Sequence, residues 1–213
     1  MSQVTRSSGG ARRSADGQPA ERRAESPGRR RENIFLIGFS GTGKSRSGRS
    51  VARRLGWRFV DTDQIIERRE GMGIPDIFAE RGEEHFRRLE REVLKDVAAQ
   101  SRQVISTGGG MPVSAENRAL MGESGLRVRL TASAETIHRR LARSKRPGRD
   151  GVVRPLLGAR APLARVRELL AEREAAYAES DVTVDTERNR PTEVIDRIVE
   201  LWEGDIRNQG RPR

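Results

Sequence analysis

The sequence contains no cysteine among its 213 residues, which excludes disulfide bonds and thiolate metal sites. It has only two histidines, His85 and His138, so a histidine-rich zinc site is not expected either. No apolar run approaches the roughly 20 residues that span a bilayer, and the N-terminus lacks the apolar core of a secretory signal. We therefore expect a cytoplasmic protein without membrane partners.

Aromatic residues make up only 4% of the chain, whereas its net charge is +11. Solubility and genome bias explain most of this charge, and attraction of a polyanionic ligand to a basic cleft is the functional alternative. No stacking or groove-reading motif accompanies the charge, so we expect no nucleic-acid partner. Of the 42 basic residues, 39 are arginines and three are lysines. Lys44 is informative for that reason, because a compact ammonium is chemically required where it stands.

The chain divides into three parts by composition. Residues 1–32 are mostly Ser, Gly, Pro, Arg and Glu and carry a net charge of +4, which predicts a disordered basic tail. A nucleic-acid or membrane-surface arm is the alternative for this segment. Residues 33–203 carry the apolar segments of one domain, as the chain length suggests, and residues 204–213 are expected to be a frayed C-terminal tail.

Short apolar runs alternate with amphipathic segments along the domain. The predicted strands are residues 34–37, 58–61, 104–106, 126–130 and 182–184. The predicted helices are residues 44–55, 65–69, 84–99, 133–143, 163–178 and 191–202. This alternation predicts an α/β fold, a three-layer sandwich in which a five-stranded parallel sheet has helices on both faces. Residues 144–160, rich in Gly, Pro and Arg, are too irregular for an element.

The most specific motif is the segment 38–45, GFSGTGKS, which fits the phosphate-binding pattern G-x-x-x-x-G-K-S/T. A predicted strand precedes it and a predicted helix follows, so a chance glycine-rich turn is a poor alternative. The glycines allow backbone N–H groups to point at phosphate oxygens, and the helix adds its positive N-terminal end. Lys44 is expected to reach the β- and γ-phosphates of ATP, and the Ser45 hydroxyl to ligate Mg²⁺. The expected ATP-binding residues of the loop are Gly41, Thr42, Gly43, Lys44 and Ser45.

Acidic and glycine residues follow the second and third predicted strands. Open α/β sheets bind ligands at the carboxyl edge of their strands, so these residues are expected near the nucleotide. Of Asp61 and Asp63, one carboxylate can hold the water shell of a metal and the other can accept a hydroxyl group; helix capping is the alternative. The third strand leads into three glycines, which expose the backbone to a ligand or form a plain flexible turn. These glycines are Gly108, Gly109 and Gly110.

Six motifs in this order resemble the shikimate kinase family over residues 33–202. They are the loop 38–45, the acidic segment 61–63, the segment FRRLE at 86–90, the glycines 108–110, the segment RPLL at 154–157, and Arg173 followed by Tyr177. Tyr177 itself is expected to pack rather than to bind a ligand. The resemblance implies a P-loop kinase fold with a mobile lid at about 144–160. We expect a monomer. The resemblance also implies Mg²⁺ and ATP-dependent phosphorylation of the 3-hydroxyl of shikimate, which gives shikimate 3-phosphate and ADP.

The resemblance assigns roles to the residues around the acceptor. Arg87 and Arg173 match the two arginines that bind the shikimate carboxylate, and planar guanidinium forks suit that group. Asp63 matches the residue that hydrogen-bonds the ring hydroxyls and orients or deprotonates the 3-hydroxyl. Asp61 matches the acid that positions Mg²⁺ through water. The glycines 108–110 match the floor of the shikimate pocket.

The resemblance also assigns roles on the nucleotide side. Arg154 matches the lid arginine that closes over the phosphates. Arg143 is expected to contact adenine, with Arg188 or Arg190 after the fifth strand as alternatives. Arg46 stands where the family commonly has threonine, and a charge beside the phosphates is expected to alter nucleotide affinity. The predicted catalytic residues are Lys44, Asp63 and Arg154.

Other functions of the same fold are the alternatives. A gluconate kinase has no evident need for both Arg87 and Arg173 beside the glycines, and a nucleotide acceptor would favour a larger insert. A ligand-sensing module of a DNA-binding regulator would need a helix-turn-helix. Residues 1–32 are too short and too polar to form one.

Overall fold

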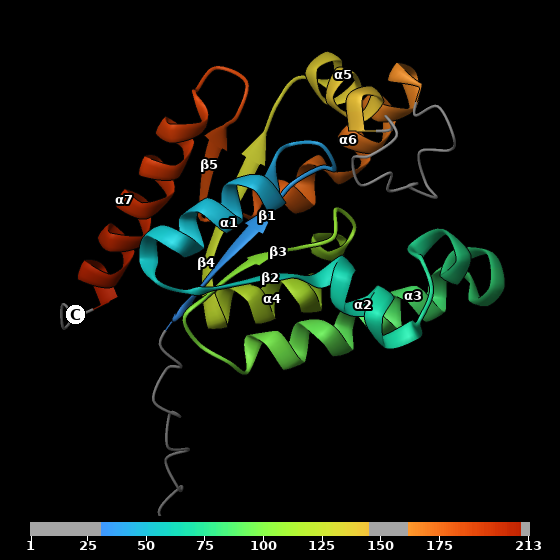
Figure 1. Ribbon diagram of the computed structural model, residues 1–213, viewed down its shortest axis with the longest axis horizontal. Coiled ribbons are helices and arrows are strands. Elements are labelled where there is room, and N and C mark those ends of the chain that lie inside the picture. The colour runs from blue at the N-terminus through green and yellow to red at the C-terminus, as the bar shows by residue number, and fades with distance from the viewer. Residues whose placement is uncertain (1–30, 145–161, 210–213) are drawn as a thin grey trace, which may run out of the picture.

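Five parallel strands form the centre of the molecule in the order β2-β3-β1-β4-β5 (Figure 1). The strands are β1 (Asn33–Ile37), β2 (Arg58–Asp61), β3 (Gln103–Ser106), β4 (Gly125–Thr131) and β5 (Val182–Asp185). The computed structural model describes residues 31–144 and 162–209. The predicted tail up to residue 30, the predicted lid with Arg154 and the last four residues lie outside the described residues. The predicted five-stranded parallel sheet is confirmed.

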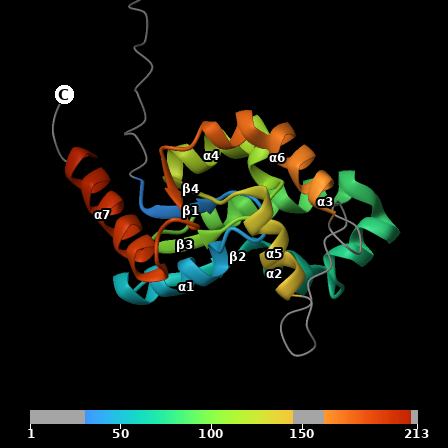
Figure 2. The same ribbon diagram turned by 90° about the horizontal axis from the view of Figure 1, so that it is seen from above.

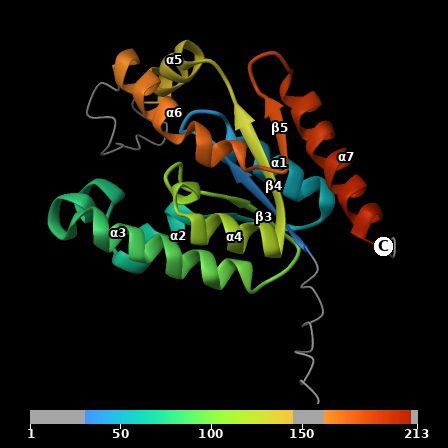
Figure 3. The same ribbon diagram turned by 180° about the vertical axis from the view of Figure 1, so that it is seen from behind.

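Helices cover both faces of the sheet. They are α1 (Lys44–Leu55), α2 (Thr62–Glu70), α3 (Ile74–Ala98), the short 3₁₀ helix η1 (Met111–Val113), α4 (Ala115–Ser124), α5 (Ala134–Ser144), α6 (Leu163–Ala178) and α7 (Pro191–Gln209). Figure 2 shows α1 and α7 on one side of the sheet, and Figure 3 shows α3, α4 and α6 in front of the other. Within residues 31–144 and 162–209, no helix is both long and apolar enough to cross a membrane.

Strand β1 explains why the sheet is buried on both faces. All five of its residues are buried, and successive side chains of a strand point to opposite faces. Ile34 and Leu36 therefore pack in one core with α1 and α7, which includes Trp202. Phe35 and Ile37 pack in a second core with α2, α3 and α4. A central strand buried on both faces is typical of parallel sheets, and this one leads directly into the loop at residue 38.

Two helical regions differ from the sequence prediction. A helix was predicted only over residues 84–99, but α3 begins at Ile74 and continues through a kink at Gly82 (φ 78°, ψ 170°). Helix α4 was not predicted, because its apolar residues are few and do not form a strong amphipathic pattern. The signal that could have found it is Ser114, whose Oγ accepts a hydrogen bond from the backbone N–H of Asn117 at 3.4 Å.

The ordered domain extends beyond the predicted boundaries, residues 33 and 203, at both ends. Arg31 was placed in the disordered tail, but it forms ion pairs with Asp181 (3.4 Å) and Asp205 (3.8 Å). Glu32 belongs to the ordered part as well, since its N–H donates to the Ser124 carbonyl at 3.2 Å. Helix α7 continues to Gln209, whereas fraying was expected from residue 204. Polar contacts with distant residues order these segments, and composition alone does not reveal such contacts.

Candidate active site

The loop between β1 and α1 contains the phosphate-binding motif at residues 38–45. Gly38 has φ 130°, and a Cβ at this position would lie 2.3 Å from the Leu130 carbonyl oxygen, so only glycine fits. Gly43 adopts a left-handed conformation (φ 96°) immediately before α1 begins at Lys44. The first N–H groups of α1 are therefore directed at the loop. This arrangement is typical of an anion site at a helix N-terminus.

Lys44 lies over this loop with its side chain largely buried. Its Nζ donates hydrogen bonds to the carbonyl oxygens of Gly38 (2.8 Å) and Phe39 (3.0 Å). Both acceptors belong to the loop itself, so the ammonium group is held at the point where the backbone can receive phosphate oxygens. The geometry fits the role that the motif predicts for Lys44.

Ser45 and Asp61 meet at the end of the sheet. The Ser45 hydroxyl donates to Asp61 Oδ2 at 2.7 Å and lies 3.2 Å from Ser106 Oγ. Asp61 and Ser106 are paired across β2 and β3, which explains their proximity. Asp61 precedes α2 but makes no capping hydrogen bond through its side chain, so the helix-capping alternative is wrong for this residue. Carboxylate and hydroxyl oxygens are the donors that Mg²⁺ prefers, and the pair therefore fits that ion.

Asp63 lies in the first turn of α2 and is directed at the glycine segment. A Cβ on Gly108 would lie 2.5 Å from Asp63 Oδ1. This oxygen is buried and has no hydrogen-bond partner among the described residues. Burial raises the pKa of Asp63 to about 7, and the positive charge of Lys44 opposes the rise. Negative charges raise the pKa further, and they come from Asp61, Glu90 and Glu67.

The raised pKa of Asp63 predicts a pH-dependent stability. The folded enzyme keeps this proton up to about pH 7, whereas the unfolded chain releases it near 3.8. The folded state thus binds more protons between these values, and the free energy of unfolding should fall as the pH rises from about 4 to about 7. The variant Asp63→Asn should lack this fall and be more stable above pH 7 by a few kcal/mol, at ~1.4 kcal/mol per pKa unit.

Urea unfolding of the ligand-free wild type and Asp63→Asn at pH 5 and pH 8 measures this effect. The exposed Asp96, which pairs with Arg69, provides the control variant Asp96→Asn, and this variant should keep the wild-type pH dependence. Parallel pH profiles for wild type and Asp63→Asn would contradict the assignment.

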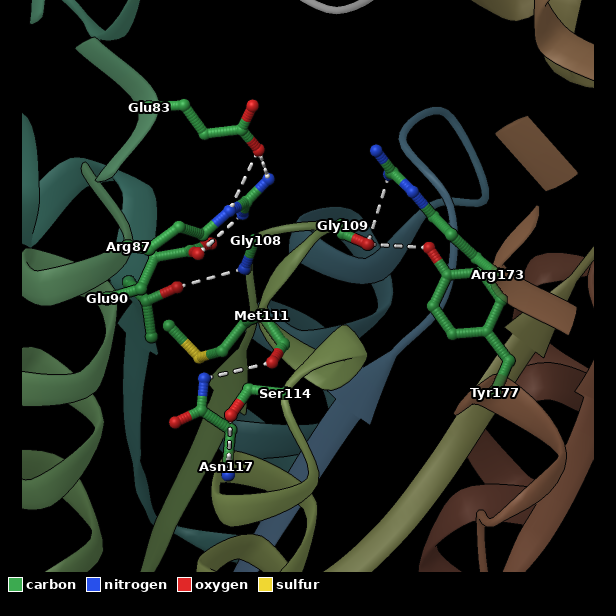
Figure 4. Close-up of polar contacts among 11 residues, drawn as sticks. Glu83, Arg87, Glu90, Gly108, Gly109, Met111, Ser114, Asn117, Arg173 and Tyr177 are labelled. Carbon is green, nitrogen blue, oxygen red and sulfur yellow. Dashed lines mark hydrogen bonds and ion pairs between the residues drawn. The ribbon is translucent and has the colours of Figure 1, made fainter. Parts of the chain in front are cut away.

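Arg87 is fixed by two carboxylates of its own helix, α3 (Figure 4). Its Nε and NH2 donate to Glu83 Oε1 at 3.2 and 2.7 Å, and its NH1 donates to Glu90 Oε2 at 2.6 Å. A Cβ on Gly110 would lie only 2.3 Å from Arg87 NH1. The absence of a side chain at Gly110 therefore allows the guanidinium group to lie against the glycine segment. About a quarter of the Arg87 side chain (26%) is exposed, so it remains accessible to a ligand.

Glu90 is a site residue that sequence reasoning quoted within a motif but left without a role. Its side chain is buried, and burial raises its pKa, while the charge and hydrogen bond of Arg87 oppose the rise. Its second oxygen, Oε1, is buried without a hydrogen-bond partner among the described residues. The available signal was its spacing, because residues three apart on a helix are neighbours.

Arg173 and Tyr177 reach the same glycine segment from α6. Arg173 NH1 and the Tyr177 hydroxyl both donate to the Gly109 carbonyl oxygen, at 3.2 and 2.6 Å. The Arg173 guanidinium also lies over the Phe39 ring, 5.5 Å from its centroid. Tyr177 is buried, so the expected packing role is confirmed, and its hydrogen bond adds to it. Figure 4 shows Arg87 and Arg173 on opposite sides of the segment.

Thr62 holds the beginning of the glycine segment, a role that the sequence analysis missed. Thr62 lies between Asp61 and Asp63 in the sequence, and its side chain is fully buried. Its Oγ1 accepts a hydrogen bond from the Gly108 N–H at 3.0 Å. Together with Tyr177, Thr62 fixes the backbone that separates the two arginines.

A cavity of about 510 Å³ lies beside the P-loop. It opens between α1 and the segment that joins β5 to α7, and its size suits a small-molecule ligand. Residues that line it include Thr42, Gly43, Arg46, Arg140, Asn189 and Pro191. The cavity therefore extends from the phosphate-binding loop along the first two turns of α1, as far as Ser50.

Residues 40–203 match the family model described as shikimate kinase. The chain belongs to the shikimate kinase family. A shikimate kinase of Geobacter metallireducens is 42% identical over 172 residues, which cover 81% of this chain and 92% of the relative. A shikimate kinase of Thermus thermophilus is 45% identical over 171 residues, which cover 79% of this chain and 89% of the relative.

A solved structure agrees with this assignment. The shikimate kinase from Acinetobacter baumannii in complex with shikimate has a TM-score of 0.73 and 34% sequence identity, and the match covers 82% of this chain and 94% of that chain. The resemblance that the six ordered motifs indicated is thus confirmed. The protein is a kinase that uses ATP.

In this shikimate kinase family member, the described residues that line the cavity beside the P-loop do not include the arginines predicted to contact adenine. Arg143 and Arg190 are exposed, and their assignment stays a prediction. Arg140, which sequence reasoning missed, does line the cavity. It donates to the Thr186 hydroxyl (2.9 Å) and carbonyl (2.7 Å) and to the Gly41 carbonyl (3.4 Å), so it joins the P-loop to the segment after β5.

Proposed function

We propose that this enzyme transfers the γ-phosphoryl group of ATP to the 3-hydroxyl of shikimate, which gives shikimate 3-phosphate and ADP. The observation that carries this proposal is the pair Arg87 and Arg173, which come from different helices and lie on opposite sides of the glycine segment. Two guanidinium forks that flank the same segment suit a small acid as acceptor, because they would bind its carboxylate. The Acinetobacter relative was solved with shikimate, which supports the same acceptor.

Asp63 is the group that would receive the acceptor hydroxyl. Its buried Oδ1 has no hydrogen-bond partner among the described residues and faces Gly108, so a ring hydroxyl placed there would satisfy it. A carboxylate with a pKa of about 7 can accept a proton near neutral pH. Asp63 would therefore orient the 3-hydroxyl and take its proton as the O–P bond forms.

The nucleotide would occupy the P-loop and the neighbouring cavity. Lys44 and the N–H groups at the start of α1 would hold the phosphates, and the base would lie in the cavity near Pro191. Ser45 and Asp61 would hold Mg²⁺, which when bound neutralises charge on the phosphate oxygens. Arg154, outside the described residues, keeps the phosphate-contacting role that the resemblance implies.

Positioning supplies most of the proposed catalysis. Phosphoryl transfer requires the attacking oxygen, the phosphorus and the leaving oxygen to lie roughly in line, with charge stabilised at the transferred group. Asp63 fixes the attacking oxygen, Arg87 and Arg173 fix the ring that carries it, and Lys44 stabilises the phosphoryl oxygens. The chain thus contributes orientation and charge.

Replacing Arg87 with lysine should raise the KM for shikimate about 10- to 100-fold, because a single ammonium cannot replace a bidentate fork. The KM for ATP should change less than about twofold. Arg88→Lys is a matched control, since Arg88 is the adjacent residue and forms an exposed ion pair with Glu84. Steady-state kinetics with each substrate varied in turn measures both values. An unchanged KM for shikimate in Arg87→Lys would contradict the carboxylate role.

The acceptor itself is tested by ADP release with shikimate, quinate and gluconate. Shikimate should support the highest kcat/KM, and phosphorus NMR of the product should show a phosphate ester on the 3-hydroxyl. Gluconate as the preferred acceptor would favour the related kinase activity. ATP binding without turnover on any acid would overturn the proposed reaction.

A further inference from the structure

Arg87 already binds a carboxylate of its own helix along one edge of its guanidinium group. Its Nε and NH2 both donate to Glu83 Oε1, at 3.2 and 2.7 Å. These two nitrogens lie side by side, and such a pair of donors can bind a carboxylate through two parallel hydrogen bonds. Glu83 therefore occupies a carboxylate-binding edge of Arg87.

The other side of the guanidinium group is closed to a ligand. NH1 donates to Glu90 Oε2 at 2.6 Å, and a Cβ on Gly110 would lie only 2.3 Å from NH1. Figure 4 shows the carboxylates of Glu83 and Glu90 on opposite sides of Arg87. An acid that uses two donors of Arg87 must therefore bind at the edge formed by Nε and NH2, which Glu83 occupies.

The two glutamates differ in how easily they can leave Arg87. The Glu90 side chain is 1% exposed and its Oε1 has no hydrogen-bond partner among the described residues, so its departure would leave a buried charge unpaired. The Glu83 side chain is 53% exposed, so water can solvate its carboxylate. Glu83 also follows Gly82, whose non-helical backbone (φ 78°, ψ 170°) interrupts the turn that restricts side-chain rotamers inside a helix. Glu83 is thus the displaceable partner.

Arg173, on the other side of the glycine segment, has no such competitor. Its guanidinium group contacts the neutral carbonyl of Gly109 at 3.2 Å and the ring of Phe39. In the part of the chain that the structure describes, Arg173 forms no ion pair. A carboxylate that enters the site can therefore bind Arg173 without displacing a charge, whereas at Arg87 it must replace Glu83.

We propose that Glu83 competes with the acceptor carboxylate for Arg87 and thereby sets the affinity of the enzyme for its acid substrate. The acid displaces Glu83 from the edge formed by Nε and NH2, and Glu83 returns to this edge when the acid leaves. The phosphorylated product carries the same carboxylate, so the competition weakens substrate and product binding alike and favours product release. This inference rests on the proposed function, which places an acid at Arg87.

Calorimetric titration with shikimate measures the competition. Glu83→Gln should lower the Kd about two- to fivefold, because a neutral amide holds Arg87 less strongly than a carboxylate does, and an exposed ion pair is weak. Glu84→Gln is the matched control. Glu84 is the next residue, forms the same type of ion pair with Arg88 and is 91% exposed, so this variant should keep the wild-type Kd to within about 1.5-fold.

Glu83→Asp separates the contact from the charge, because it keeps the charge on a shorter side chain that reaches Arg87 less well. This variant should also lower the Kd for shikimate. A higher Kd in Glu83→Gln would show that Glu83 positions Arg87 for the acid, and this result or an unchanged Kd would overturn the proposal. A lower Kd in Glu83→Gln with a wild-type Kd in Glu83→Asp would attribute the effect to net charge and overturn it as well.

Acetate distinguishes this inference from the proposed function, because it is a carboxylate without an acceptor hydroxyl. Its binding can be followed by the NMR signal of the Arg87 Nε–H group, assigned by its loss in Arg87→Lys. Acetate should bind Glu83→Gln more tightly than wild type by the same factor as shikimate, since both displace the same group. If the wild type bound acetate at Arg87 but did not bind shikimate, the proposed acceptor would be wrong, and the acetate titrations would still decide the role of Glu83.

Discussion

Replacing Lys44 with alanine should lower kcat by about 10³-fold while the domain still folds. The ammonium group is held over the P-loop by the carbonyl oxygens of Gly38 and Phe39, where the transferred phosphoryl group would lie. No other lysine is near in the sequence, and the variant leaves neutral atoms in place of the charge that stabilises the transition state. A coupled assay of ADP release at saturating substrates measures the effect.

Lys95→Ala is the matched control for this variant. Lys95 is one of the three lysines of the chain and is exposed on α3, so its loss should leave kcat within about twofold. Circular dichroism and thermal unfolding should show both variants folded. A Lys44→Ala enzyme with more than a tenth of the wild-type kcat would show that this ammonium is not the catalytic cation.

Replacing Asp63 with asparagine should lower kcat by about 10²- to 10⁴-fold, the range typical of a lost general base. An amide of nearly the same shape still hydrogen-bonds the hydroxyl but cannot take its proton at neutral pH. The affinity for ADP should stay near that of wild type, because no contact of Asp63 with the P-loop is required for nucleotide binding. The Asp96→Asn control should retain full activity.

The outcome of this experiment separates two roles of Asp63. Loss of kcat with an unchanged KM for shikimate would indicate proton transfer, whereas a raised KM with normal kcat would indicate binding alone. Wild-type values of both kcat and the KM for shikimate would show that Asp63 takes no part in the reaction. Its raised pKa would then reflect only the burial of its carboxylate.

The sequence was sufficient where a local pattern determines geometry. The P-loop could be predicted because its glycines and Lys44 have a fixed spacing between a strand and a helix. The meeting of Asp61 with Ser45 could be expected from the common carboxyl edge of parallel strands. The strands were placed to within one residue because each is short and centred on apolar residues, and β1, which is buried along its whole length, is the clearest example.

The rest of the site depends on tertiary contacts that no local pattern encodes. Glu90 and Thr62 act through side-chain hydrogen bonds with Arg87 and Gly108, and both look like ordinary helix residues in the sequence. Arg140 is one of many arginines, and only the packing of α5 near the segment after β5 distinguishes it. In a chain with 39 arginines, residue type carries little information about which of them line a cavity.

A crystal structure of the enzyme with ADP and shikimate tests the central claim most directly. We expect the shikimate carboxylate to accept hydrogen bonds from both Arg87 and Arg173, with the 3-hydroxyl at Asp63 and facing the phosphates above Lys44. A ring bound with its carboxylate turned away from both guanidinium groups would contradict the proposed acceptor site. Only the proposed ATP binding would then remain supported.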